Sequence, residues 1–143
     1  DNSGRHGETA WQQADETGLP NVARTLRVWT RLCHFFVNAA RAVDMGPGDL
    51  IQAVEVVNEA PCFRAEIDRD LLRAFIIETY YIVRNTLGPS VRVYFHDCFL
   101  PHIWADFMPP SRFNNVALDR HEYQVFSLGQ IGWTREMHLR LAC

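Results

Sequence analysis

Polar side chains that can do chemistry lie at or near the ends of three apolar segments of the chain. They are Asn58 and Glu59 after residues 51–57, His96 and Asp97 after residues 91–95, and Asp119, His121 and Tyr123 within residues 116–126. Carboxyl, imidazole and phenol groups can exchange protons with a reacting ligand and can hydrogen-bond to it. If the three segments are neighbouring strands, the sequence therefore predicts one acid/base site at their ends.

Glu59 carries the most specific chemical expectation. A carboxyl group at the end of a strand, among aromatic side chains, is partly removed from water, and this raises its pKa. We therefore expect Glu59 to keep its proton near neutral pH and to act as a general acid. The amide of Asn58 suits a sugar hydroxyl group, and Asn58 must reach the site over the strand end because successive strand residues face opposite sides. Glu55 lies deeper in the same strand, and we expect it to be structural.

Aromatic side chains are frequent between residues 99 and 126, and two interpretations stay open. They could form flat platforms for the apolar faces of a sugar ring, or they could be ordinary core residues. The residues concerned are Phe99, Trp104, Phe107, Phe113 and Phe126. For Trp104 and Phe107, which lie three residues apart, core packing is the favoured interpretation.

Hydrophobic periodicity predicts the elements that must position these residues. Spacings of three and four predict a helix over residues 22–44, whose apolar stripe is Val22, Leu26, Trp29, Cys33, Phe36, Ala40 and Val43. A second helix is predicted from an N-cap at Asp68 to the stop at Gly88, with one face formed by Leu72, Phe75, Ile76, Thr79, Tyr80, Val83 and Leu87. Strands are predicted over residues 51–57, 91–95 and 116–126, a loop or short helix over 99–113, a loop over 1–20, and a last helix from about Thr134.

Alternation of strands with long helices predicts the α/β class with a parallel sheet. In such folds ligands bind at the carboxyl ends of the strands, where the polar residues are expected here. A doubly wound sheet and a part of a (β/α)8 barrel both fit this order of elements. No glycine-rich phosphate loop follows any of the predicted strands, which disfavours nucleotide binding.

Length, charge and cysteine spacing exclude several classes of protein. The 143 residues carry a formal net charge of −3, which disfavours binding to nucleic acid or to an anionic membrane surface. We expect no membrane span, since there is no apolar run of the required length. The 4 cysteines form no C-x-x-C pair, so we expect no metal site and no cofactor, and buried free thiols with at most one cysteine in a disulfide.

Four segments, in order, resemble motifs of glycoside hydrolase family 5, and in particular of its fungal exo-β-1,3-glucanases. Residues 54–60 (VEVVNEA) resemble the Asn-Glu motif at the end of strand four. Residues 93–99 (VYFHDCF) with 104–108 (WADFM) resemble the family's His-Asp-Ala-Phe and Trp-x-x-Phe segments. Residues 118–126 (LDRHEYQVF) resemble the strand-six motif, and residues 1–4 (DNSG) resemble the loop after strand three. The resemblance spans nearly the whole chain.

The resemblance implies a role for each matching residue. Glu59 would be the general acid/base of a retaining hydrolase that acts on β-1,3-glucan. Asn58, His121 and Tyr123 would line the subsite at which the bond is cleaved. Looser matches place Asn2 at the terminal glucose, and Phe99 and Phe126 as an aromatic clamp at the next subsite. Ala60 stands where the family often has proline, so the loop leaving strand four can differ.

The resemblance also implies that the chain is an internal fragment of one catalytic domain, 1–143, comprising about strands four to six of a (β/α)8 TIM barrel with their helices. Retaining hydrolysis needs a second carboxyl group roughly 5–5.5 Å from the first, and the family's nucleophile would lie beyond Cys143. We therefore expect the isolated chain to be inactive and, with unpaired sheet edges, unstable or aggregated. The least favoured option is that Asp119 or Glu122 substitutes for the nucleophile.

A different class of function stays open beside the hydrolase. The chain could be a non-catalytic sugar-binding or scaffold remnant that keeps the acid only by descent. The partner expected from the resemblance is a β-glucan or oligosaccharide, with no protein partner inferred, and the expected location is extracellular or in the cell wall. The choice between exo and endo action depends on loops outside these residues.

Overall fold

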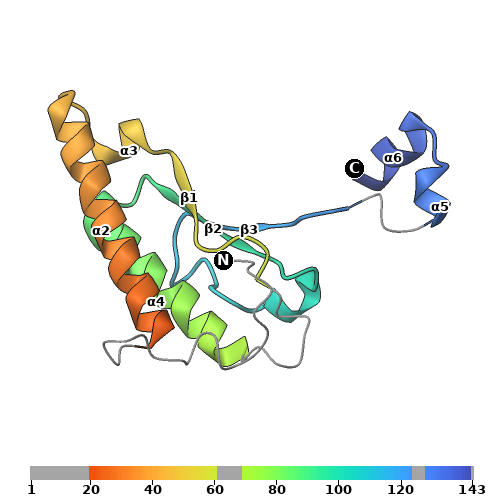
Figure 1. Ribbon diagram of the computed structural model, residues 1–143, viewed down its shortest axis with the longest axis horizontal. Helices are drawn as coiled ribbons and strands as arrows, with labels where there is room; N and C mark the ends of the chain where they lie inside the picture. The colour runs from red at the N-terminus through yellow and green to blue at the C-terminus, as the bar shows by residue number, and fades with distance from the viewer. Residues whose placement is uncertain (1–19, 61–68, 124–127, 143) are drawn as a thin grey trace.

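The computed structural model describes residues 20–60, 69–123 and 128–142 (Figure 1). The elements, in chain order, are helices α2 (Asn21–Ala42) and α3 (Pro47–Leu50), strand β1 (Ala53–Glu55), helix α4 (Arg69–Leu87), strand β2 (Arg92–His96), the 3₁₀ helix η1 (Pro101–Trp104), strand β3 (Val116–Asp119), and helices α5 (Leu128–Ile131) and α6 (Arg135–Ala142). The predicted loop over residues 1–20 and the predicted N-cap Asp68 lie almost entirely outside the described residues. In Figure 1, α5 and α6 lie apart from the sheet and its two long helices.

The two long helices confirm the periodicity of the sequence. Every residue of the predicted apolar face of the second helix is buried in α4. The predicted stripe of α2 packs on the same core from Val22 to Phe36, and Ala40 is buried. Val43 follows the last residue of the helix and is 58% exposed. The helices α2 and α4 lie side by side against the sheet (Figure 1). Their apolar stripes and the sheet together form the hydrophobic core, which is the arrangement that amphipathic helices favour.

The sheet is parallel, as the alternation of elements predicts. Among the described residues it has three strands in the order β1-β2-β3. Val54 pairs with Val93, and Val93 pairs with Val116. Because side chains alternate along a strand, these residues and Phe95 share one face, and that face joins the hydrophobic core. Glu55, His96 and Asp119 occupy the opposite face by the same register, so the polar groups share one surface of the sheet.

Strands β1 and β3 are shorter than predicted, whereas β2 has the predicted length and begins one residue later. Strand β1 covers Ala53–Glu55 rather than residues 51–57, and β3 ends at Asp119. His121 and Tyr123 therefore lie beyond the strand, and a two-residue alternation along one strand does not explain their position. The short helices α3 and α5 were not predicted, because one helical turn gives no periodic signal.

Arg84 of α4 connects the two segments that lead into the neighbouring strands. Its guanidinium group donates hydrogen bonds to the carbonyl oxygens of Gly88 and Val91, in the segment before β2. It also donates to the carbonyl oxygens of Asn114 and Asn115, before β3, and to the side-chain oxygen of Asn114. The same group lies 4.7 Å from the centre of the Tyr80 ring. One side chain thus fixes the starts of β2 and β3 relative to α4.

The aromatic segment after β2 is mostly core. Trp104 and Phe113 are buried, and Phe107 packs against the same cluster. The ring of Phe95 lies 5.3 Å from those of both Trp104 and Phe107. These contacts support the core interpretation for those three residues. Phe99 is the exception, being 37% exposed.

Two cysteines can be placed. Cys33 is buried and free, as predicted. Cys98 is also buried, and it is disulfide-bonded, as the sequence analysis allowed for one cysteine. No helix in the described part of the chain is long and apolar enough to cross a membrane.

Candidate functional site

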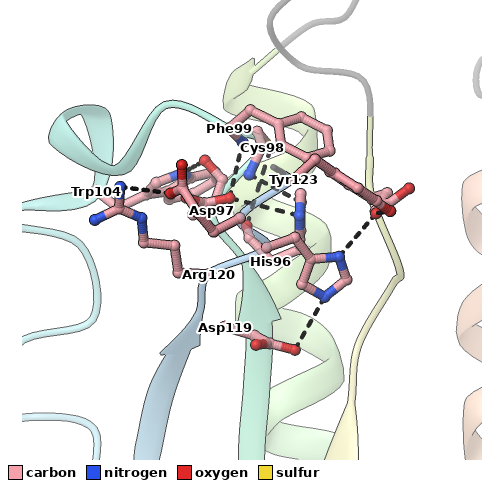
Figure 2. Close-up of polar contacts among 11 residues, drawn as sticks. His96, Asp97, Cys98, Phe99, Trp104, Asp119, Arg120 and Tyr123 are labelled. Carbon is pink, nitrogen blue, oxygen red and sulfur yellow. Dashed lines mark hydrogen bonds and ion pairs between the residues drawn. The ribbon is translucent and has the colours of Figure 1, made fainter. Parts of the chain in front are cut away.

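Three of the predicted site residues meet through one carboxylate oxygen. The Nδ1 atom of His121 lies 2.8 Å from Oε1 of Glu59. The hydroxyl group of Tyr123 donates a hydrogen bond to the same oxygen. On its other side, Nε2 of His121 lies 3.3 Å from Oδ2 of Asp119 (Figure 2). The segments after β1 and β3 thus bring together side chains more than 60 residues apart, as expected for the carboxyl ends of parallel strands.

His96, the last residue of β2, lies behind this cluster. It is 2% exposed, and the centre of its ring lies 4.4 Å from that of His121, with the two planes at 75°. Its Nδ1 atom accepts a hydrogen bond of 2.9 Å from the backbone N–H of Cys98. An accepting Nδ1 places the proton of the neutral ring on Nε2. Burial, with the nearby positive charge of His121, lowers the pKa of His96 and keeps it neutral.

Two left-handed turns aim the side chains at the strand ends. Glu59 has φ of 47°, and Cys98 and Phe99 have φ of 56° and 61°. Each such residue costs of order 1–3 kcal/mol in backbone strain. The turn after β2 is held by Asp97, whose side chain accepts the N–H of Phe99 at 2.8 Å and whose carbonyl oxygen accepts the indole N–H of Trp104 at 2.8 Å.

Phe99 is thereby placed beside the cluster, with Asp97 and Cys98 close to it (Figure 2). Its ring centre lies 4.8 Å from that of His96 and 6.0 Å from that of Tyr123. A partly exposed ring at this position can contact a ligand that approaches Glu59.

The charge state of Glu59 differs from the one predicted. Hydrogen bonds from His121 and then from Tyr123 lower the pKa of Glu59, and they outweigh the opposite effect of burial. The expectation of a raised pKa is therefore wrong for this arrangement, in which the donors favour the ionised form. The same contact with Glu59 is the main cause that raises the pKa of His121, and Asp119 adds to it.

Glu55 is the carboxyl group whose pKa is raised, first by burial and then by the negative charge of Asp119. Its Oε1 atom is buried and has no hydrogen-bond partner among the described residues. Glu55 lies in β1, before the turn that carries Glu59, and its expected structural role stays a prediction.

Two sets of side chains come close enough to share a cation, namely Glu59, His96 and His121, and Glu55, Asp119 and His121. The first set is a poor match, because the Nδ1 of His96 already accepts the Cys98 N–H. A metal on Nε2 would require a doubly deprotonated ring. In the second set both ring nitrogens of His121 already face carboxyl groups, Nδ1 that of Glu59 and Nε2 that of Asp119. We therefore assign no metal to this part of the chain.

The structure brings some of the predicted site residues together and not others. Glu59, His121 and Tyr123 are in contact, and Phe99 lies beside them. Asn58 is exposed at the end of the segment after β1. Asn2 and Phe126 lie outside the described residues. The sequence identifies His96 and Asp119 only as strand-end polar residues, yet both contact His121. The signal for this is that the two residues share one face of the sheet.

Comparison with known proteins identifies relatives along the whole chain. The chain is 34% identical over 145 residues to "Glucan 1,3-beta-glucosidase" of Blumeria graminis, covering 100% of the chain and 30% of the relative. It is 30% identical over 144 residues to "Probable glucan 1,3-beta-glucosidase A" of Aspergillus terreus, with 100% and 30% covered. It is 31% identical over 145 residues to "Glucan 1,3-beta-glucosidase 1" of Schizosaccharomyces pombe, with 100% and 32% covered. Along its whole length the chain is thus similar to proteins named glucan 1,3-beta-glucosidase.

The family expected from the motifs is thus confirmed. The chain spans about 30% of the length of these curated family members. No protein-family model matches the chain, and no solved structure does either.

Proposed function

We propose that these residues are the part of a β-1,3-glucan hydrolase that carries the acid/base residue. Glu59 protonates the glycosidic oxygen as the bond breaks and later activates the water that completes hydrolysis. The observation that carries this proposal is the junction of Glu59, His121 and Tyr123 at the carboxyl edge of a parallel sheet. The names of the relatives supply the substrate class, a β-1,3-linked glucan.

The rest of the hydrolase is proposed from the same resemblance. The three strands correspond to about strands four to six of a (β/α)8 barrel within one catalytic domain. The polar face of the sheet, with His96 and Asp119, is then the barrel interior. The nucleophile of a retaining reaction comes from sequence outside these residues, and the isolated chain is inactive. Secretion to the cell exterior or the cell wall belongs to this proposal as well.

The substrate-facing roles follow from the arrangement around Glu59. One oxygen of its carboxylate is occupied by His121 and Tyr123, so the other is the oxygen that faces the substrate. The exposed amide of Asn58 hydrogen-bonds to a sugar hydroxyl group, and the Phe99 ring packs against an apolar sugar face. Asn2 and Phe126 are proposed to complete this subsite.

The test is Glu59→Ala in the natural protein that contains this chain. General acid catalysis contributes about 10²–10⁴-fold, so turnover of laminari-oligosaccharides should fall by that factor. For 2,4-dinitrophenyl β-glucoside the rate of the first step, cleavage of the glycosidic bond, should fall far less, because this leaving group needs no proton. Added azide should then yield a β-glucosyl azide, since a small anion can enter the space vacated by the carboxylate.

The matched control is Glu136→Gln, which removes an exposed carboxylate of α6 that pairs with Arg140. It should leave all rates unchanged. Normal oligosaccharide turnover by Glu59→Ala would refute the role of Glu59. Binding of laminari-oligosaccharides by a wild-type protein without any turnover would favour the sugar-binding remnant instead.

A further inference from the structure

His121 lies between two carboxylates, and this arrangement has a chemical consequence. Its Nδ1 faces Glu59 at 2.8 Å and its Nε2 faces Asp119 at 3.3 Å. An ionised carboxylate only accepts hydrogen bonds, and a neutral imidazole has a proton on one nitrogen only. Both contacts are satisfied together only when both nitrogens carry protons. The geometry therefore describes an imidazolium ion bonded to an ionised Glu59.

We propose that the proton which Glu59 delivers to the substrate is held, in the resting site, on Nδ1 of His121. This inference rests on the proposed hydrolase function and deepens it. His121 acts through Glu59 and is a positioning residue that also stores the proton. The acid/base unit is then the Glu59–His121 pair, which holds one proton between its two members.

The groups that surround His121 from each element support this charge state. Glu55 of β1, Asp119 of β3 and Glu59 after β1 are acidic groups close to the ring, and the Tyr123 hydroxyl donates to Glu59. The ring of the buried His96 of β2 lies edge to face against the His121 ring and is neutral. One cation among several acidic groups lowers the cost of their mutual repulsion. The raised pKa of His121 has the same origin.

The proposed proton path balances in both half-reactions. As the nucleophile attacks the anomeric carbon, the glycosidic C–O bond breaks and its electron pair goes to the leaving oxygen. Nδ1 of His121 gives its proton to Glu59, the carboxyl group turns about its Cγ–Cδ bond, and this proton passes to the leaving oxygen. His121 is then neutral and Glu59 is again ionised. In the second half-reaction Glu59 removes a proton from the attacking water and returns it to Nδ1.

A pH profile of kcat/KM separates this role from a purely structural one. In the wild type the fall of kcat/KM at high pH reports loss of the proton from His121. Because the pKa of His121 is raised, activity should persist above the ordinary pKa of histidine. In His121→Asn the proton can be held only on Glu59, and the basic limb should move to lower pH. We expect kcat/KM for laminari-oligosaccharides to fall about tenfold or more at pH 7 and to recover largely at pH 4–5.

Two variants complete this experiment. Asp119→Asn keeps the contact between His121 and Glu59, and it should shift the basic limb in the same direction by a smaller amount. His102→Asn makes the same chemical change at an exposed histidine of η1 and should leave the profile unchanged. Loss of activity by the same factor at every pH in His121→Asn would overturn the proposal, because a structural role predicts that result.

A direct measurement needs no turnover. The ¹⁵N shifts of the His121 ring, recorded across pH 5–9, should show an imidazolium ion at pH 7 in the wild type and a lower midpoint in Glu59→Gln. A neutral ring at pH 7 would overturn the proton store while leaving the acid role of Glu59 intact. Absence of glucan turnover together with a charged ring would instead refute the proposed hydrolase.

Discussion

Replacement of Arg84 by lysine tests how the sheet is held in place. The guanidinium group donates hydrogen bonds to four backbone carbonyl oxygens and one side-chain oxygen. These acceptors lie in the two segments that precede β2 and β3. A lysine has three donors at one point, and it cannot reach both segments at once. We therefore expect about three of the five hydrogen bonds to be lost.

The size of the effect follows from the exposure of these bonds. A hydrogen bond contributes about 0.5–1.5 kcal/mol net, and several of those at Arg84 are partly exposed, so the lower half of that range applies. Three lost bonds then predict a decrease of about 2 kcal/mol in the free energy of unfolding. With an m value of about 1–3 kcal/mol/M in urea, the midpoint should fall by roughly 1 M.

Urea denaturation of the natural protein, followed by tryptophan fluorescence, measures this shift. The matched control is Arg112→Lys, because Arg112 is exposed and lies 5.3 Å from the Phe113 ring centre without bridging two segments. It should change stability by less than about 0.5 kcal/mol. Equal midpoints for the two variants would refute the argument that Arg84 anchors the starts of β2 and β3.

Two further predictions concern buried groups. Burial raises the pKa of Cys33 to about 11. This thiol should therefore not react with a thiol reagent at pH 8 in the folded protein, and it should react after denaturation. Rapid reaction of Cys33 in the native protein would contradict its burial. His96→Phe should cost about 1–3 kcal/mol, since it leaves the buried Cys98 N–H without an acceptor, whereas His96→Asn can keep an acceptor there. A thermal midpoint lower for His96→Asn than for His96→Phe would show that ring packing on His121 outweighs that hydrogen bond.

Local sequence patterns were sufficient to predict the two long helices and the order of helices and strands. The buried face of α4 agrees with its predicted face at every position. In a long helix that packs on a core, apolar residues recur every three to four positions, and this spacing is visible in the sequence. The strands were harder, since β1 and β3 are only three and four residues long. Their predicted ends therefore extended into turns, and His121 was placed in a strand that ends at Asp119.

The sequence by itself determined which chemical groups reach the carboxyl edge of the sheet and which family motifs they match, because both are properties of short segments. Only the tertiary structure decided the charge of Glu59. Burial at a strand end suggested a protonated acid, yet the two donors to the carboxylate come from residues 62 and 64 positions later in the chain. A pKa depends on distances of a few ångströms, and those distances arise only when β1 and β3 are brought to the two sides of β2.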